Sequence, residues 1–254
     1  MKTVYLCEDS IEGIFSAIYR AYEDKNGHRN NEIQVQREGW NRQFFCEYVT
    51  VDTDFERAVK VARTVRRDIS NQAYEFLLKV AASYREEKAD AMYRFMIEGL
   101  HMGRRALQHL TAPHMQTLCD IERNVNNEIN HFIEFLRFEE LENGTLFGKI
   151  NPKSAVLPYL AEHFEDRFSG ERFIIADTIR RTVLIHNVET PTVYATMEEA
   201  DFDELTLSYS KEEEEMQKLW RLFVDTIAIK ERINPRLQRQ LLPLRFRKYM
   251  KEFS

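Results

Sequence analysis

The sequence contains few glycines, prolines and cysteines. Among 254 residues there are 8 Gly and 6 Pro, which favours long helices over a loop-rich β architecture. The three cysteines, Cys7, Cys46 and Cys119, are widely spaced and odd in number, so we predict neither a disulfide framework nor a CxxC metal or redox motif. No apolar run approaches the ~20 residues of a membrane span. The N-terminus, MKTVYLCEDSIEG, lacks the apolar region of a signal peptide, and we expect a cytoplasmic protein without membrane contact.

Catalytic and phosphate-binding signatures are missing as well. GxSxG, GxxxxGK[ST] and GxGxxG do not occur, which excludes phosphate loops of those kinds. Several potential metal ligands fall in one region that we expect to be helical, but they form no HxxxH or HExxH pair; they are His101, His109, His114, Cys119 and His131. We therefore expect no metal and no cofactor. Whether the chain is an enzyme stays open.

What the chain does have is a strong charge contrast near its C-terminal end. Residues 230–251, KERINPRLQRQLLPLRFRKYMK, hold eight Lys or Arg and one Glu, a net of +7, in a chain whose formal charge is −6. We call these residues the basic end. Cations along short helices, interleaved with Phe246 and Tyr249, suit contact with phosphates and stacking on a base or sugar. The predicted nucleic-acid-binding residues are Arg232, Arg236, Arg239, Arg245, Arg247 and Lys248.

An acidic tract offers an alternative explanation of the basic end. Residues 198–215 hold nine acids and one Lys, a net of −8, and the basic end could fold against them in a solvated charge network of modest energy. If instead four to six cations neutralise phosphates of duplex DNA, the log–log salt slope should be roughly −4 to −5. Two further basic sets either extend such a surface or are ordinary exposed helix faces; they are Arg57, Lys60, Arg63, Arg66 and Arg67, and the pair Arg104 and Arg105.

The first half of the chain is predicted to be mostly helical. Apolar residues recur at helical spacing in several segments, and Thr53 with Glu56 fits a capping box that begins one helix. Before it, a short strand and an extended segment are expected. The expected elements are a strand over 3–7, a helix over about 10–22, an extended segment over 32–51, a helix from about 53, a helix over about 71–101 with a break near 86–90, and a helix opened by Pro113.

The second half is predicted to form a sheet with a helix on one face. The aromatic run 132–141 reads as a strand, and Asn143-Gly144 is a turn that hairpins favour. The hairpin links are too short for a parallel crossover, so the ββαββ(β) order predicts an antiparallel sheet. Its other expected elements are strands over 145–150, 173–176, 182–186 and 192–196 and a helix over 155–168. The fold class is thus α+β, with a helical region 1–130 packed beside an α+β region 131–254, or one composite domain.

The C-terminal helices are predicted from caps and apolar stripes. A helix from Lys211 carries a stripe that we expect to dock on the core, formed by Met216, Leu219, Trp220, Phe223, Val224 and Ile227. Asn234 as N-cap with Pro235 at the first helical position starts a further helix. After Pro243 we expect Phe246, Met250 and Phe253 to pack, while Arg245, Lys248 and Lys251 stay outside.

A possible pocket combines Arg137 and Asp177. Asp177 follows a predicted strand and could act as a general acid or base, with Arg137 projecting from the sheet face beside Phe135. A carboxylate at such a position is more often a turn residue than a catalyst. Both readings stay open.

Several separate blocks of the chain resemble a bacterial family described as probable DNA metabolism proteins. The blocks are VYLCEDSIEGIFSAIYRAYE, HFIEFLRFEE, VLPYLAEHFEDRF, FIIADTIRR and LWRLFVDTIAIKERINPRLQRQLLPLRFRKYMKEF, in the same order and covering nearly the whole chain. Members carry a domain of unknown function of the 4130 type. The resemblance supplies no catalytic residues, and it makes INPRLQRQLLPLRF, HFIEFLRF and ADTIRR the first segments to test.

The resemblance implies a role in DNA repair or modification. Genes of this family tend to accompany a radical-SAM protein of DNA modification or repair, which makes that enzyme an expected partner beside DNA. Similar domains are fused elsewhere to a uracil-DNA glycosylase-like domain, but the given sequence ends at Ser254 and shows no glycosylase signature. Three hypotheses follow: an accessory DNA-binding protein, a protein-interaction adaptor without DNA contact, or a hydrolase or glycosylase acting on a modified base. The oligomeric state is not predicted.

Overall fold

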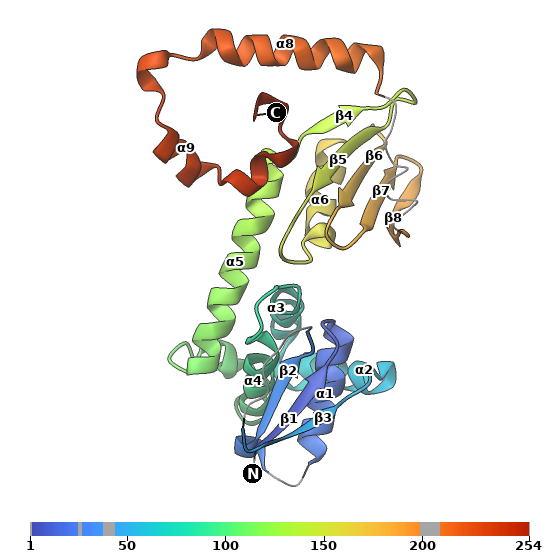
Figure 1. Cartoon of the computed structure of the whole chain (residues 1–254). Coiled ribbons are helices and arrows are strands. Elements are labelled where there is room, and N and C mark those ends of the chain that lie inside the picture. Colours follow the sequence, from blue (N-terminus) through green and yellow to red (C-terminus); the bar gives the residue numbers. More distant parts are fainter. Residues whose placement is uncertain (1, 25–26, 38–43, 199–208, 254) are drawn as a thin grey trace. The chain divides into compact units, whose positions relative to one another are not determined.

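The computed structural model describes residues 2–24, 27–37, 44–198 and 209–253. The chain forms two compact units, Met1–Asn126 and Asn127–Ser254, and the division falls within helix α5 (Pro113–Phe135) (Figure 1). Both helices and sheets are present, which confirms the α+β class. Along the described ranges, no helix is both long enough and apolar enough to cross a membrane.

The first unit is built on a three-stranded parallel sheet of order β2-β1-β3. The central strand β1 (Lys2–Cys7) is buried along most of its length, as expected for a strand of a parallel sheet covered on both faces. It pairs with β2 (Asn31–Val35) and β3 (Cys46–Thr50). Helix α1 (Ile11–Glu23) links β1 to β2 and begins where Ser10 accepts a hydrogen bond from Gly13 N. The predicted strand over 3–7 and helix over 10–22 are confirmed.

Helices complete the first unit. The predicted break is present, but it lies at 82–87 rather than 86–90, because one helix ends at Ala81 and the next begins at Lys88. Gly99 lies so close to Ile69 that a Cβ added there would be 2.3 Å from Ile69 Cδ1, so any larger residue would force the Ile69 side chain to move. The helical elements are η1 (His28–Asn30), α2 (Phe55–Thr64), the π-helical turn η2 (Val65–Ile69), α3 (Asn71–Ala81), α4 (Lys88–Met102) and η3 (Gly103–Gln108).

The predicted capping box at α2 is wrong. The residue that caps α2 is Asp54, whose Oδ1 accepts from Arg57 N at 3.1 Å. Thr53 instead donates its hydroxyl to the Glu8 carboxylate at 2.6 Å. The chain therefore enters the helix one residue later than the S/T-x-x-E pattern suggested.

The second unit contains a five-stranded sheet of order β4-β5-β6-β7-β8. The link between β5 and β6 contains helix α6, and these two strands are parallel. A fully antiparallel sheet was therefore a wrong prediction for this pair, because a connection that includes a helix is long enough for a parallel crossover. The remaining neighbours are antiparallel hairpins. The elements are β4 (Phe138–Glu140), β5 (Leu146–Ile150), α6 (Leu157–Arg167), β6 (Phe173–Asp177), β7 (Thr182–Asn187) and β8 (Thr190–Thr196).

The predicted strand over 132–141 is wrong in its first part. Helix α5 continues to Phe135, and only Phe138–Glu140 forms strand β4. Val125, Ile129 and Phe132 are all buried at helical spacing on α5, so the helical period extends into the aromatic run. Phe138 then packs edge-on against Phe164 of α6 and Phe173 of β6.

The C-terminal part of the second unit arches away from the sheet and returns to it (Figure 1). Asn234 caps α9 by accepting from Leu237 N, with Pro235 in its first turn, as predicted. Phe246 and Met250 are buried as expected, whereas Phe253 is exposed. The elements are α8 (Lys211–Ile227), η4 (Lys230–Arg232), α9 (Pro235–Leu241), η5 (Leu244–Tyr249) and η6 (Lys251–Phe253). We call residues 218–241 the arm.

The apolar stripe of α8 does not dock on the core. Leu219, Trp220 and Phe223 are 58%, 43% and 51% exposed, which overturns the prediction that they pack inside. The apolar residues of η4 and α9 are exposed too, among them Ile233, Leu237 and Leu241. The arm thus exposes large apolar side chains on both α8 and α9.

Candidate nucleic-acid interface and ligand pockets

The predicted nucleic-acid-binding residues fall into three groups, of which the first lies on the arm. Arg232, Arg236 and Arg239 are exposed. Arg239 Nε donates to Pro235 O within α9 at 3.2 Å. In the described part of the chain, no carboxylate forms an ion pair with any of the three arginines. Arg232 ends η4, and Arg236 and Arg239 lie on α9, which begins at the Asn234 cap.

The second group anchors the chain end. Arg245 Nη1 donates to Glu128 Oε1 at 2.9 Å. Glu128 is 3% exposed and also accepts from the backbone N–H of Lys153 and Ser154 at 2.8 and 3.1 Å. Arg247 donates through Nε and Nη2 to Leu242 O and lies 4.5 Å from the ring centroid of Phe253. Both arginines therefore hold structure together.

Lys248 forms the third group, by itself. It is exposed, with Nζ 5.0 Å from the ring centroid of Tyr249. Lys251, expected to stay outside, is ion-paired with Glu139 and only partly exposed. Of the cations of the basic end, the arm arginines and Lys248 remain the best placed to meet a ligand.

The acidic tract does not neutralise the arm in the residues that the structure describes. Residues 199–208 lie outside those residues. In α8, Glu213 accepts from Glu140 N and from Gln217 Nε2, which ties the start of the helix to β4. Among the described residues, no ion pair joins Glu212–Glu215 to an arm arginine, so the predicted internal charge network is not seen there.

Two neighbouring pockets lie in the second unit where α8 and the chain end meet β4. The larger, about 350 Å³, is lined by Arg137, Phe138, Glu139, Glu213, Met216, Gln217, Trp220, Lys251 and Glu252. The smaller, about 150 Å³, is lined by Arg137, Glu139, Phe147, Lys149, Tyr209, Lys248, Tyr249 and Lys251. Three residues, Arg137, Glu139 and Lys251, line both. The two pockets are therefore adjacent.

Ion pairs form the wall that the two pockets share. Arg137 Nη2 donates to Glu252 Oε1 at 2.8 Å, and Lys251 pairs with Glu139. The pKa of Tyr209 is raised, first by burial and then by its hydrogen bond to Glu139. The wall is thus built from paired charges and is held in a defined geometry.

Asp177 does not join this wall. It is 0% exposed, and its Oδ1 accepts from the backbone N–H of Ile179 and Arg180 at 2.9 and 3.2 Å. Its Oδ2 accepts from Arg180 Nη1 at 3.2 Å. These are the contacts of a turn residue, and the described pockets that Arg137 lines do not include Asp177. The structure does not bring the predicted pair together.

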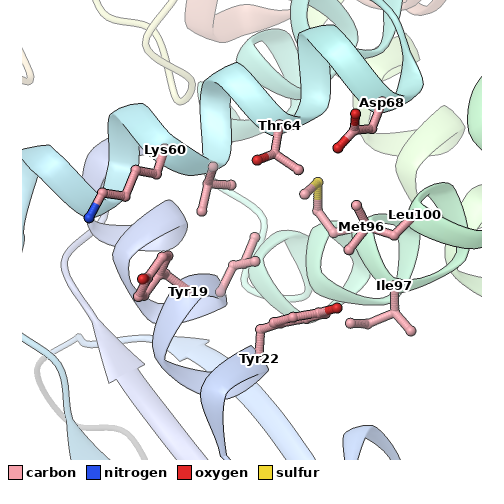
Figure 2. Close-up of a pocket in the computed structure, with 10 residues that line it drawn as sticks. Tyr19, Tyr22, Lys60, Thr64, Asp68, Met96, Ile97 and Leu100 are labelled. Carbon is pink, nitrogen blue, oxygen red and sulfur yellow. The ribbon is translucent and has the colours of Figure 1, made fainter.

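An apolar pocket of about 310 Å³ lies in the first unit between α1, α2 with η2, and α4 (Figure 2). Tyr19, Tyr22, Thr64 and Asp68 add polar atoms to its lining. Lys60 lies at its edge, 5.8 Å from the Tyr19 ring centroid. The wider basic set of this region is largely engaged with its own helices: Arg57 pairs with Asp54, Arg66 lies 3.8 Å from the Tyr74 ring centroid, and Arg67 pairs with Asp68. These contacts favour the reading of an exposed helix face.

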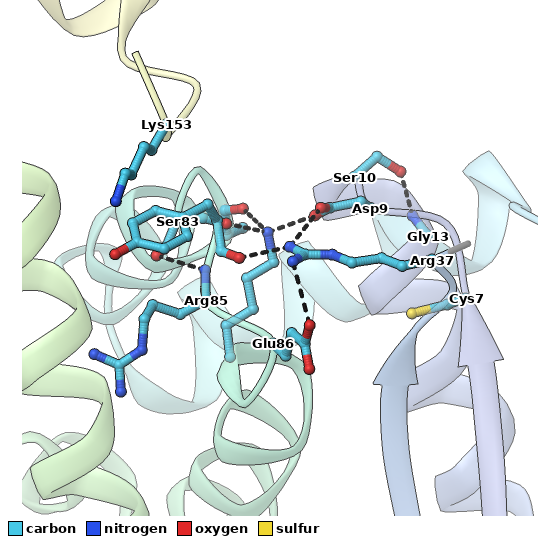
Figure 3. Close-up of polar contacts among 12 residues, drawn as sticks. Cys7, Asp9, Ser10, Gly13, Arg37, Ser83, Arg85, Glu86 and Lys153 are labelled. Atoms are coloured by element: carbon cyan, nitrogen blue, oxygen red, sulfur yellow. Dashed lines mark hydrogen bonds and ion pairs between the residues drawn. The ribbon is translucent and has the colours of Figure 1, made fainter. Parts of the chain in front are cut away.

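A buried lysine lies near the carboxyl end of β1 in the first unit. Lys88 Nζ donates to the carbonyl oxygen of Ala81 at 2.7 Å, to the carbonyl of Ser83 and to the Asp9 carboxylate. Arg37 Nη2 donates to the same carboxylate at 3.2 Å (Figure 3). Burial raises the pKa of nearby Cys7 to about 12, so its thiol stays protonated. Sequence reasoning missed this cluster, because Lys88 follows two glutamates and reads as a surface residue.

Two of the histidines weighed as metal ligands converge on Glu98. His109 Nδ1 contacts Glu98 Oε1, and His114 Nε2 lies 2.5 Å from Oε2. The second contact is an ion-pair distance without hydrogen-bond geometry. Burial alone would raise the pKa of Glu98, but the hydrogen bond from His109 and the charge of His114 outweigh it and lower the pKa. No group of three potential ligands among the described residues is arranged to hold a metal.

Comparison with known proteins identifies one family. A family model described as a domain of unknown function (DUF4130) matches residues 86–252, which is more than half of the chain. The match begins at Glu86, just before α4, and includes α5, the five-stranded sheet, the arm and both pockets of the second unit. A search of curated proteins finds no match.

Proposed function

Because the chain belongs to the DUF4130 family, we propose that it is an accessory protein of DNA repair or modification that binds DNA through the arm. In this proposal it acts in the cytoplasm beside a radical-SAM enzyme of DNA modification or repair. The family description itself assigns no activity. The proposal rests on the arm and on the resemblance to DNA metabolism proteins.

The arrangement of Arg232, Arg236 and Arg239 is the observation that carries the proposal. The three guanidinium groups lie on η4 and on α9, which Asn234 caps; they are exposed and lack carboxylate partners in the described chain. Arginine is suited to bidentate contact with phosphate. A net charge of −6 for the whole chain does not oppose this role, because binding needs a local basic surface rather than a basic protein.

A protein-interaction adaptor is the second candidate function. It is favoured by the half-exposed apolar stripe of α8, which includes Leu219 and Phe223. Large exposed apolar surfaces mark sites of protein association more often than sites of DNA contact. The two functions are compatible, because the apolar residues of α8 and the arginines near α9 belong to the same arm. The hydrolase hypothesis named Asp177 or a nearby Glu as its acid or base, and it loses Asp177, which is fully buried and accepts from the turn that follows β6.

The DNA proposal is tested by titrating labelled single- and double-stranded DNA at low salt. The variant Arg236→Glu/Arg239→Glu should lower the affinity at least about tenfold, because two phosphate contacts become repulsions. The matched control is Arg29→Glu/Arg123→Glu, which changes the net charge by the same amount at two exposed positions of the first unit. No binding at low salt, or an equal effect of both double variants, would contradict the proposal.

A further inference from the structure

We infer that the two adjoining pockets of the second unit form one binding site for a nucleotide, with the phosphate in the smaller pocket and the base in the larger. This site uses Arg137, Lys149, Lys248 and Trp220. None of these residues is one of the three arginines, Arg232, Arg236 and Arg239, that we propose to contact DNA. The inference therefore goes beyond DNA binding by the arm and does not depend on it.

The smaller pocket has the charge and size for a phosphate group. Its lining contains four cations and one carboxylate, a net of +3. Within the described residues, Lys149 and Lys248 have no carboxylate partner; their ammonium groups lie 5.4 and 5.0 Å from the ring centroids of Phe147 and Tyr249. Aromatic rings hold lysine side chains in place without neutralising them. About 150 Å³ accommodates a compact anion rather than a ring system with its sugar.

Arg137 keeps hydrogen-bond donors for such an anion. One guanidinium nitrogen donates to Glu252 and the other, more weakly, to Glu134 O at 3.4 Å. Arginine carries five N–H donors, so several are not used by these two contacts. The Glu252 pair fixes the guanidinium at the boundary of the two pockets, which is the place where a phosphate joined to a larger group would lie.

The larger pocket suits a planar ring with N–H donors. Phe138, Met216 and Trp220 give it an apolar lining, and every base has a face that stacks on aromatic side chains. Trp220 is stacked against Phe223 at 5.8 Å between ring centroids, which restricts the indole. Glu213, Gln217 and Glu252 place acceptor oxygens around the lining. A volume of about 350 Å³ lies in the range of small-ligand pockets.

The adjacency of the two pockets favours a nucleotide over a simpler ligand. A free phosphate would occupy only the basic pocket, and an apolar side chain would occupy only the aromatic one. The shared wall of Arg137, Glu139 and Lys251 places an anion site directly beside a stacking site. The ligand chemistry that matches both is a nucleoside phosphate, either free or as one unit of a single strand.

Trp220 fluorescence tests the inference directly. The sequence has two tryptophans, Trp40 and Trp220, so Trp40→Phe leaves Trp220 as the only indole reporter. In that background, adenosine 5′-monophosphate should change the emission at lower concentration than adenosine or inorganic phosphate alone. Lys248→Glu should weaken the monophosphate about tenfold, because a charge-assisted contact is lost, and should leave adenosine unaffected. Lys218→Glu, on the exposed face of α8, is the matched control.

The outcomes distinguish a free nucleotide from a nucleotide within a strand, and they distinguish this site from DNA binding by the arm. Tighter binding of the monophosphate than of a single-stranded oligonucleotide indicates a free nucleotide, and the reverse order indicates a strand. No change in emission with either probe, or equal weakening by Lys218→Glu and Lys248→Glu, would overturn the inference. Arg236→Glu/Arg239→Glu should leave monophosphate binding unchanged, so loss of DNA binding by the arm and loss of this site are seen separately.

Discussion

Glu128 links three separate segments of the second unit. It lies on α5, accepts from the two backbone N–H groups of Lys153 and Ser154, and pairs with Arg245 near the chain end. Replacing this carboxylate leaves two amides and one guanidinium without their acceptor. We therefore expect Glu128→Ala to lower the free energy of unfolding by about 3 kcal/mol, measured by urea denaturation.

The control for this prediction lies on the same helix. Glu134 is exposed on α5, and a surface substitution of this kind usually changes stability by no more than about 0.5 kcal/mol. Glu134→Ala therefore measures any loss of stability that comes from replacing a glutamate of α5 by alanine rather than from the contacts of Glu128. If the two variants unfold at the same urea concentration, Glu128 is not an anchor.

Glu98 should make the first unit sensitive to acid. Its pKa is lowered below its usual 4.5 by His109 and His114 despite burial. A lowered pKa in the folded state stabilises the fold above the ordinary pKa, and this contribution is lost as the pH falls through both values. Between about pH 5 and pH 3, thermal stability should fall more steeply for the natural chain than for Glu98→Gln. Parallel curves for the two proteins would rule out this role.

Single residues differ in how far their roles can be read from sequence. Asn234 and Pro235 were predictable because a helix start is a local pattern. Lys88 was not, since its burial depends on Asp9 and on two carbonyls of the preceding turn. Arg245 was predicted to contact nucleic acid, but its partner Glu128 is remote in sequence. Contacts of that kind leave no periodic signal.

At the scale of elements, most helices and strands were predictable from sequence. The errors concern one helix end, one strand direction and the surroundings of one amphipathic helix. Aromatic residues in the run 132–141 favour a strand, yet the buried spacing of Ile129 and Phe132 on α5 continues a helix to Phe135. Strand direction was missed between β5 and β6, because the helix between them was not counted as a crossover. The amphipathic pattern of α8 predicts an apolar face but not what covers it.

Helix α8 should therefore tolerate polar substitutions on its apolar stripe. Leu219 and Phe223 are half-exposed, so Leu219→Ser/Phe223→Ser should leave the melting temperature nearly unchanged. The same variant should reduce co-purification with the radical-SAM enzyme that we propose as a partner, after co-expression, because it removes the apolar contact surface.

A buried residue provides the comparison for α8. Phe246 is buried against Phe132 and stacked on His131, so Phe246→Ala should destabilise the second unit by about 3 kcal/mol. A large fall in melting temperature for the α8 variant would show that the stripe is packed in solution. Undiminished co-purification would argue against the adaptor function.

For the whole molecule, the distribution of charge sets the salt dependence of DNA binding. Arg245 and Lys251 are committed to Glu128 and Glu139, which leaves three arm arginines as the main phosphate contacts. The log–log salt slope for duplex DNA should then be about −3, shallower than the roughly −4 to −5 expected for four to six phosphate contacts. Affinities measured over a range of salt concentrations give this slope. A value of about −5 or steeper would mean that the anchored cations also reach the DNA.

The arm is fastened at both of its ends. At one end Glu213 of α8 accepts from Glu140 N; at the other, Arg245 and Phe246 of η5 hold to α5. A segment closed in this way has less conformational freedom to lose on binding than a free tail of equal length. A single proteolytic cut within the arm would leave two segments, each held at one end only. Such a cut should weaken binding, although every contact residue would still be present.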